Sequence, residues 1–229
     1  MTHPSRGEGE IMTTNTQSSQ FTKNFPAHQG HICAFFNSMD EQHRVLQPFI
    51  KYGFDQRDKA YHLVDPEQRE EHLRWLAEAG IDVREAMSTG QLEVRPWRDG
   101  PLQNAGLDPD TWMATFEQAL QLGSVAGYAH TRFLAHMEWA LGQRWKEVDL
   151  FEFETRLNYV IPKYEDLVIC SYDLMKFGAS VIIDAMRTHP VVIIGGLVHE
   201  NPFFVPPDQL MDEIRERRQT RNHAGTKAE

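Results

Sequence analysis

Apolar and polar positions along the chain follow two different periods, and the switching between them predicts an α/β fold. Residues 31–37, HICAFFN, form an apolar run rich in β-formers. Residues 38–56 repeat apolar side chains at helical spacing, and residues 60–65 return to a strand pattern. A strand–helix–strand unit of this size is typical of a right-handed crossover between parallel strands. Ligands often bind at the turn after such a first strand, because the helix N-terminus supplies free N–H groups there.

The same alternation continues to the end of the chain. Further strands are predicted at residues 91–97, 124–133, 166–174 and 191–196, with a short edge strand at 203–205. Further helices are predicted at residues 66–79, 81–88, 109–122, 148–161, 173–189 and 207 to about 218. The apolar runs are too continuous for a sheet with one solvent-exposed face, so a mostly parallel sheet covered by helices on both faces is expected. The loop at residues 98–108, rich in Gly, Pro, Asn and Asp, is predicted to be a mobile lid.

Composition divides the chain into one domain and two tails. Residues 1–26 are polar and without periodicity, which predicts a disordered segment, and residues 219–229 form a charged tail. Residues 27–218 are predicted to form the single domain. The longest apolar run, Val191 to Val198, is far shorter than the roughly 20 residues that span a bilayer. Without a membrane span or a signal-peptide core, a cytoplasmic protein is expected.

Charge and cysteine content narrow the possible classes of function further. The formal net charge of −10 disfavours direct nucleic-acid binding. The arginines between 215 and 221 alternate with glutamates and are predicted to be a solvated face. Cys33 and Cys170 lie inside apolar strands, where reduced and inert thiols are expected.

The turn predicted after the first strand does not carry a nucleotide-binding motif. None of the 15 glycines is followed by Lys, so the phosphate loop of P-loop ATPases is absent, and Asn37–Glu41 stands at its position. Gly195-Gly196 lacks the third glycine of a dinucleotide fingerprint and predicts a tight turn. Asp173, at the end of an apolar strand, suits either a Mg²⁺ shell or a helix N-cap.

Metal and catalytic motifs are equally weak. The sequence contains no HExxH and no CxxC, and its histidines are scattered. His28 and His31 straddle a loop–strand boundary, so their spacing does not predict a ligand pair. We therefore predict no metal site and no catalytic residue, and no cofactor is indicated.

Aromatic and polar residues near the predicted carboxyl ends of strands remain as candidates for a binding site. A pocket is predicted over the ends of the first, second and fifth strands, because open α/β sheets bind ligands in that crevice. Its predicted walls are Phe36, Trp97, Trp139 and Tyr172. Asn37, His62 and Arg132 are predicted to orient a small and fairly apolar ligand. The competing interpretation is that the aromatic side chains are core.

The order of motifs resembles one family. HICAFFNSMDEQ, FIKYGFDQRDKAYHLVD, LAEAGIDV, GQLEV, TRFLAHMEWAL, FEFETRLN, LVICSYDL and THPVVIIGG followed by NPFFVPP are similar to the methanogen/methylotroph regulator sensory (MEDS) domain, over residues 28 to 212. The resemblance implies a three-layer RecA-like domain that has lost its phosphate loop and senses small molecules such as hydrocarbon derivatives. The family pattern carries over to His31, Arg132, Trp139, Glu138, Glu154, Asn158, Cys170, Tyr172, His189 and Pro190, and through it His189 joins the predicted ligand-binding residues.

Three function classes follow. The first is a non-catalytic sensor that binds a small molecule and signals through a protein partner, either a kinase, an anti-sigma factor or a transcription factor. The resemblance leaves a homodimer open, and no kinase or helix-turn-helix segment follows the domain in this sequence. The second is an enzyme, either an NTPase with a non-standard phosphate loop or a small hydrolase. The third is a protein-interaction module without a ligand.

Overall fold

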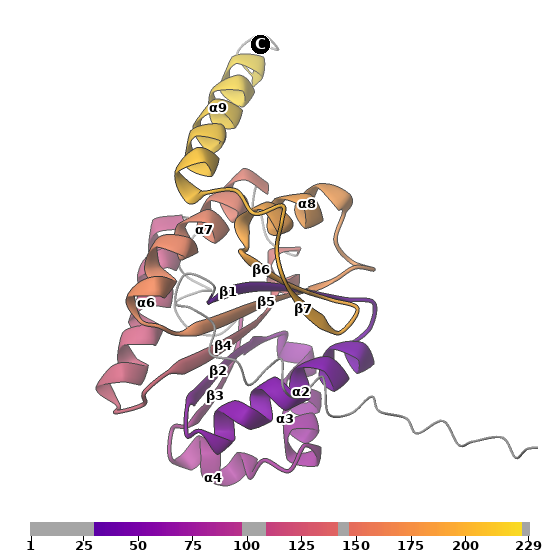
Figure 1. The fold of residues 1–229 in the computed structure, drawn as a ribbon, viewed down its shortest axis with the longest axis vertical. Coiled ribbons are helices and arrows are strands. Elements are labelled where there is room, and N and C mark those ends of the chain that lie inside the picture. The colour runs from indigo at the N-terminus through magenta and orange to yellow at the C-terminus, as the bar shows by residue number, and fades with distance from the viewer. Residues whose placement is uncertain (1–29, 98–108, 142–146, 226–229) are drawn as a thin grey trace, which may run out of the picture.

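One seven-stranded sheet organises the chain (Figure 1). The computed structural model describes residues 30–97, 109–141 and 147–225. The strand order is β3-β2-β4-β5-β1-β6-β7, and all neighbours are parallel except β6 and β7. The strands are β1 (His31–Phe36), β2 (Lys59–Val64), β3 (Leu92–Pro96), β4 (Thr131–His136), β5 (Leu167–Asp173), β6 (Val191–Ile194) and β7 (Leu197–Glu200).

Helices cover both faces of the sheet, which confirms the predicted three-layer α/β fold. They are α2 (Met39–Asp55), α3 (Arg69–Glu78), α4 (Val83–Ser88), α6 (Pro109–Val125), α7 (Glu147–Val160), α8 (Ala179–Thr188) and α9 (Pro207–Gly225), with the 3₁₀ turns η2 (Pro66–Gln68), η3 (Met137–Ala140) and η4 (Ile161–Lys163). Apolar side chains of α2, α3 and α4 pack on one face. Those of α6, α7 and α8 pack on the other face, where the start of α9 lies against α7. The sheet therefore separates two apolar cores.

The unit β1–α2–β2 forms as the hydrophobic pattern predicts. Ser38 caps α2, because its side chain accepts a hydrogen bond from the N–H of Glu41. Val45, Leu46, Phe49 and Ile50 then face the sheet and are buried. Helix α2 runs on past Gly53 to Asp55. Gly53 is needed for space, because a Cβ there would lie 2.4 Å from Cδ of Arg132.

Three predicted boundaries are wrong. The fourth strand is Thr131–His136 rather than residues 124–133, because α6 extends to Val125 and a turn with φ of +89° at Gly127 follows it. The predicted helix at 173–189 begins only at Ala179, because the side chain of Asp173 accepts from the N–H of Met175 in a turn instead of capping a helix. Helix α9 continues to Gly225, beyond the predicted end near Arg218.

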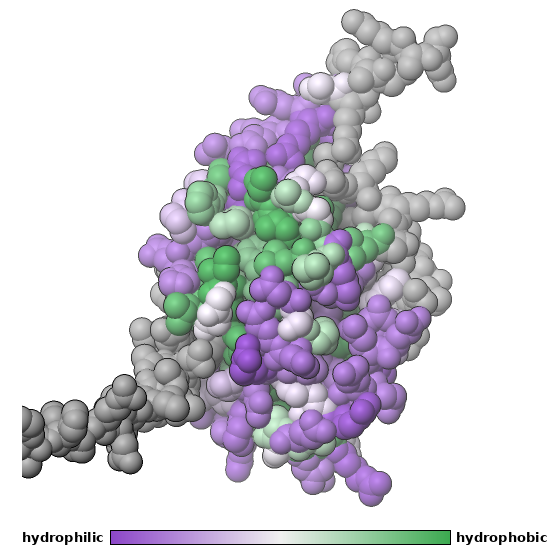
Figure 2. Space-filling model, turned by 90° about the vertical axis from the view of Figure 1, so that its right-hand side faces the viewer, coloured by the Kyte–Doolittle hydropathy of each residue, from purple (hydrophilic) through white to green (hydrophobic). Residues whose placement is uncertain are grey.

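The last edge of the sheet is a short hairpin. Gly195 and Gly196 both have positive φ, as a tight two-residue turn requires, and they join β6 to antiparallel β7. The predicted edge strand at 203–205 is wrong, because those residues form no strand and Leu197–Glu200 occupy the edge. Figure 2 faces this side of the molecule and shows apolar side chains gathered on it. Exposed apolar residues of this region are Met175, Ile183, Ile194, Leu197 and Phe203.

Three further predictions concern the N-terminal tail, the lid and the membrane. Residues 1–26 and the predicted lid at 98–108 lie outside the described residues, so those predictions stay open. Within the described part of the chain, no helix combines the length and the apolar character that crossing a bilayer requires.

Candidate functional site

An apolar cavity of about 40 Å³ lies between one face of the sheet and helices α6 and α7. Strands β2, β4 and β5 form its floor, and the two helices and η3 form its walls. Its lining residues are Tyr61, Leu63, Trp112, Thr115, Phe116, Ala119, Phe133, Ala135, Met137, Trp139, Phe153, Glu154, Leu157, Val168 and Cys170. Among these lining residues, Glu154 carries a carboxylate, and Thr115 and Tyr61 carry hydroxyl groups. The cavity is thus suited to a mostly apolar guest.

The lining follows directly from two periodicities in the sequence. Trp112, Phe116 and Ala119 lie at helical spacing on α6, and Phe153 and Leu157 do so on α7. Alternate residues of each strand point to the same face of the sheet, so β4 and β5 each contribute residues two apart. The cavity is therefore built from rigid elements rather than from loops.

Two stacked indole rings form one wall. The ring centroids of Trp112 and Trp139 are 4.4 Å apart with an interplanar angle of 14°. Phe153 approaches both rings edge-on, with centroids 5.9 Å from Trp112 and 6.4 Å from Trp139. Offset stacking and edge-on contact are the preferred arrangements of aromatic rings, so this wall is rigid and flat.

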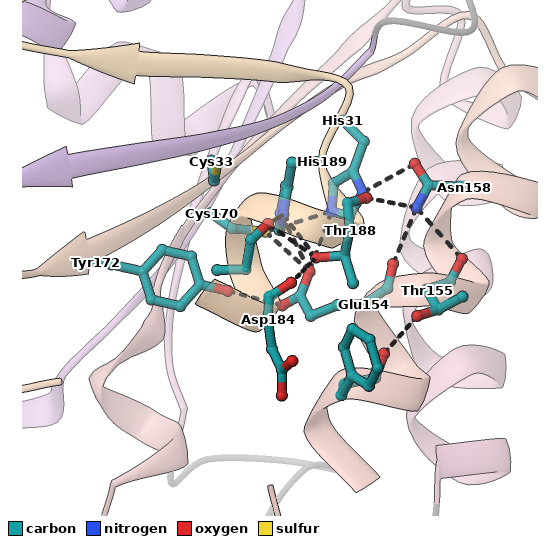
Figure 3. Close-up of polar contacts among 12 residues, drawn as sticks. His31, Cys33, Glu154, Thr155, Asn158, Cys170, Tyr172, Asp184, Thr188 and His189 are labelled. Atoms are coloured by element: carbon teal, nitrogen blue, oxygen red, sulfur yellow. Dashed lines mark hydrogen bonds and ion pairs between the residues drawn. The ribbon is translucent and has the colours of Figure 1, made fainter. Parts of the chain in front are cut away.

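The inner end of the cavity leads to a buried polar cluster, which we define as His31, Glu154, Cys170 and His189. Figure 3 shows these side chains converging from β1, α7, β5 and the residue pair before β6. One ligand atom of each residue lies within 4.8 Å of the others. All four side chains are buried. Glu154 also borders a second, smaller cavity of about 20 Å³, which Tyr172 helps to line.

The cluster lies at the amino ends of β1 and β6, not at the carboxyl ends where ligands of open α/β sheets usually bind. His31 is the first residue of β1, and His189 stands two residues before β6. Cys170 is the register partner of Cys33, two residues further along β1. The site therefore faces α7 rather than the turn after β1.

Neighbouring oxygens fix the rings of both histidines. Nδ1 of His31 lies 3.2 Å from Oδ1 of Asn158, and the amide of Asn158 is itself oriented because its Nδ2 donates to the carbonyl oxygen of Thr188 at 2.8 Å. Nδ1 of His189 lies 2.7 Å from the carbonyl oxygen of Ala185. Both Nε2 atoms consequently point toward Glu154, at 3.1 Å and 3.3 Å from its Oε2.

Burial and these contacts shift the pKa values of the cluster. Burial, together with the neighbouring His189, lowers the pKa of His31 to about 4. Burial raises the pKa of Glu154, but contacts with the two histidines outweigh it and bring the value to about 2. Burial and the Glu154 carboxylate raise the pKa of the Cys170 thiol well above its ordinary range. Near neutral pH the isolated cluster therefore holds a carboxylate and a protonated thiol.

A second group of buried histidines lies on the opposite face of the sheet. Nδ1 of His62 is 2.8 Å from Nε2 of His72, and Nε2 of His136 is 2.9 Å from Nε2 of Gln42. Burial lowers the pKa values of His62 and His136 to about 3 each, with neighbouring histidines acting in the same direction. These imidazoles are therefore neutral at physiological pH.

The eight residues predicted to bind a ligand do not form one pocket. Trp139 lines the apolar cavity, Tyr172 the smaller one, and His189 belongs to the cluster. Trp97 lies in the core on the same face as these three.

The other four of the eight lie elsewhere. Phe36 packs in the opposite core, His62 contacts His72 there, and Arg132 pairs with Asp58. Asn37 is exposed and bonds to Glu41. Phe36 and Trp139 therefore do not wall one pocket over the carboxyl ends of β1, β2 and β5, and ligand contact by any of the eight stays a prediction.

Sequence spacing could not reveal the cluster. Its members are separated by 123, 16 and 19 positions along the chain, so no short motif joins them. The expectation that no metal site exists rested on that missing spacing alone. Only the resemblance named all four positions, and it gave them no common role.

Comparisons with known proteins agree with this fold. Residues 30–190 match the family described as "MEthanogen/methylotroph, DcmR Sensory domain". The transcriptional repressor DcmR of Methylorubrum extorquens is 23% identical over 164 residues, which are 71% of this chain and 59% of that protein. The chain thus spans less than two thirds of that relative. The crystal structure of the flagellar accessory protein FlaH from Methanocaldococcus jannaschii matches 82% of each chain with a TM-score of 0.52 and 12% identity, which shows a shared RecA-like fold.

Proposed function

Because the chain belongs to the MEDS family of sensory domains, we propose that it senses a small, mostly apolar molecule and passes the signal to a regulatory protein. Its likeness to a transcriptional repressor supports a sensory and regulatory role. The proposed partner is a kinase, an anti-sigma factor or a transcription factor, with a second copy of the chain as a further candidate.

The apolar cavity carries this proposal. Stacked Trp112 and Trp139 offer a flat apolar wall, and few polar groups line the space, so it offers water few hydrogen-bond partners. The cavity of about 40 Å³ is smaller than the roughly 150 Å³ that holds benzene, so a halogenated methane or similar small guest fits best and a benzene ring would have to push the lining side chains apart. An ionic metabolite would lose its hydration here without adequate compensation.

Catalysis is not part of the proposal. Cys170 is the thiol at the cavity, and its raised pKa keeps it protonated, whereas the thiolate is the nucleophilic form. Glu154 is already engaged by two histidines and by Tyr172, whose hydroxyl lies 3.4 Å from its Oε1. These groups are arranged to hold one another rather than to attack a substrate.

Helix α7 offers a physical route for the signal. Phe153 and Leu157 face the cavity, whereas Phe151, on another side of the same helix, packs against Leu210 and Ile214 of α9. A guest that shifts α7 would therefore also shift α9. Because packed helices move as units rather than deform continuously, a small displacement in the cavity can reach the surface through this contact.

A thermal-shift screen tests the proposal. Benzene, toluene and short halogenated alkanes are added to the full chain, and stabilisation is expected because they bind only the native state. A guest at about 100 times its Kd contributes about 2.7 kcal/mol, which corresponds to roughly 5–10 °C in Tm for a chain of this size. The same screen on Ala119→Leu, which fills the cavity, should show no shift.

Ala114→Leu is the matched control. It makes the same substitution on the same helix, but Ala114 is exposed and does not line the cavity. Its guest-induced shift should equal that of the wild type. If no compound stabilises the wild type, or if Ala119→Leu responds as well as Ala114→Leu does, the cavity binds no guest and the interaction-module interpretation is favoured.

A further inference from the structure

We propose that His31, Glu154, Cys170 and His189 form a four-ligand site for a divalent transition-metal ion of the Zn²⁺ class. This inference does not rest on the proposed guest, because the ligand atoms belong to the polar cluster rather than to the aromatic wall. It adds a resident inorganic ion to a chain whose sequence shows no metal motif.

The spacing of the ligand atoms fits a tetrahedron. Four bonds of about 2.0–2.3 Å to one Zn²⁺ ion place neighbouring ligand atoms about 3.3–3.8 Å apart. In the cluster, Oε2 of Glu154 lies 3.1 Å from Nε2 of His31 and 3.3 Å from Nε2 of His189. Sγ of Cys170 lies 3.7 Å from Nε2 of His31 and 3.7 Å from Oε2 of Glu154. Four of the six edges are thus given directly, and the other two lie within 4.8 Å.

The hydrogen bonds around the cluster occupy Nδ1 of both histidines and turn both Nε2 atoms toward Glu154. A carbonyl oxygen can only accept, so the contacts of Nδ1 with Oδ1 of Asn158 and with the carbonyl oxygen of Ala185 place the protons of the two rings on Nδ1. A neutral imidazole with its proton on Nδ1 binds a metal ion through Nε2. Nε2 of His189 is buried without a hydrogen-bond partner.

Each Nε2 faces the Glu154 carboxylate favourably when either a proton or a metal ion lies between them. One proton serves one of the two Nε2–Glu154 contacts, whereas one metal ion serves both. One cation bound to both nitrogens, to the carboxylate and to the sulfur satisfies every ligand atom together. The convergence of two imidazoles, a carboxylate and a thiol on one point is what distinguishes the cluster from an ordinary buried hydrogen-bond network.

The surroundings also supply the outer contacts that metal ligands need. Asn158 and the Ala185 carbonyl orient the two rings, and the Tyr172 hydroxyl holds Oε1 of Glu154 so that Oε2 faces the cluster. Such outer contacts fix the tautomer and orientation of ligands in metal sites. They come from α7, β5 and α8, so the ion would join these elements around the start of β1.

Charge and ligand softness select the ion. A dication bound by a carboxylate and a thiolate gives a site without net charge, which a buried position favours. Two imidazoles, one sulfur and one oxygen suit the borderline ion Zn²⁺ and disfavour Mg²⁺ and Ca²⁺, which prefer oxygen ligands.

Metal binding to the full chain is the direct test. The purified chain is stripped with a chelator, incubated with Zn²⁺ alone, desalted and analysed by mass spectrometry for metal, with about one ion per chain expected. Co²⁺ is then bound in its place. Tetrahedral coordination with a thiolate ligand should give intense visible bands and a sulfur-to-cobalt charge-transfer band in the near ultraviolet.

Cys170→Ser should lose the charge-transfer band, and Cys33→Ser is its matched control. Cys33 is the register partner of Cys170 and equally buried, but its Sγ contacts the carbonyl oxygen of Val191 and takes no part in the cluster. The Cys33→Ser spectrum should match that of the wild type. Asn158→Ala should weaken Zn²⁺ binding by about 10–100-fold, because only the orientation of His31 is lost.

Two results overturn the proposal. One is a folded wild-type chain that retains no Zn²⁺ and shows no tetrahedral Co²⁺ spectrum. The other is a Cys170→Ser variant that keeps the charge-transfer band, since the metal would then be bound elsewhere. Circular dichroism checks that each variant is folded. If a variant is unfolded, the wild-type measurement alone decides.

Discussion

A buried guanidinium needs a compensating charge, and Arg132 has one in Asp58. Its Nε donates to Oδ2 of Asp58 at 2.6 Å, and both side chains are buried. The guanidinium also lies over the rings of Phe49 and Tyr52, with 4.9 Å and 5.2 Å to their centroids. These contacts anchor the start of β4 to α2, so at the scale of a single residue Arg132 is explained by stability.

Replacing Arg132 with Met should therefore cost stability without affecting guest binding. Removing one partner of a buried ion pair leaves Asp58 uncompensated, and about 3–5 kcal/mol of unfolding free energy should be lost. Urea unfolding measures this loss. A variant as stable as the wild type would contradict it, and a folded variant that no longer responds to any guest would restore Arg132 to the binding site.

The neutral histidines of the opposite face predict an acid-sensitive fold. His62 and His136 have pKa values of about 3 in the folded chain and about 6.5 when unfolded, so the unfolded state binds more protons at mildly acid pH. Stability is thus full above about pH 6.5 and falls as the pH drops toward 3. We expect these two imidazoles to contribute a loss of about 2–4 kcal/mol between pH 7 and pH 5, and buried His31 and His72, whose pKa values are also lowered, to add to it.

Urea unfolding at both pH values checks this expectation. His62→Gln should reduce the loss, because one of the buried imidazoles that take up a proton on unfolding is gone. His199→Gln, at an exposed position, is the control and should leave the loss unchanged. A wild-type chain equally stable at pH 5 and pH 7 would show that these rings are not held neutral.

At the scale of elements, the N-terminus of α2 explains what replaced the phosphate loop. Oε2 of Glu41 accepts from the backbone N–H of Asn37 at 2.9 Å and from its Nδ2 at 3.1 Å. Ser38 Oγ accepts from the N–H of Glu41 in turn. The N–H groups that would bind a phosphate are thus occupied by the chain's own carboxylate and hydroxyl.

ATP should accordingly not bind. Glu41 and Asp40 repel phosphates where a Lys would attract them, so a Kd weaker than about 1 mM is expected. Isothermal calorimetry with ATP and Mg²⁺ gives the value. Micromolar affinity would mean that the turn opens to accept phosphates, and the NTPase hypothesis would return.

Most elements could be predicted because local physics determines them. Ser38, Asp65 and Asp82 all cap helical turns through their side chains, and strands with continuous apolar runs are buried on both faces. The predicted boundaries were wrong where two elements meet within one polar stretch, as between α6 and β4. Leu197–Glu200 carries too few apolar side chains to predict an edge strand, since pairing with β6 rather than burial defines it.

At the scale of the whole molecule, the site was harder to predict than the fold. The periodicity of Trp112, Phe116 and Ala119 marks a buried helical face but cannot tell a filled core from a cavity. The polar cluster depends on four elements meeting in space, and no local pattern encodes that meeting. Placing the pocket at the carboxyl ends of strands relied on a general tendency, whereas the apolar cavity lies between the sheet and helices α6 and α7.

The ends of the chain give a prediction about the whole fold. Leu210 and Ile214 of α9 are buried against Phe151, and Arg217 pairs with Asp184 at 3.0 Å. A chain of residues 27–218 keeps these contacts and should melt within about 2 °C of the full chain. A chain ending at 206 exposes Phe151 and should melt at least about 10 °C lower. Equal melting of the two shortened chains would show that α9 adds no stability.

The position of a bound guest tests the proposed sensor most directly. Crystals of the full chain are soaked with bromobenzene, and anomalous diffraction at the bromine edge locates the heavy atom. We predict one dominant bromine peak between the sheet and α6, within contact distance of Trp139 and Phe153, in the cavity described above. No peak in that cavity, with Trp112 and Phe116 filling it instead, would contradict the account.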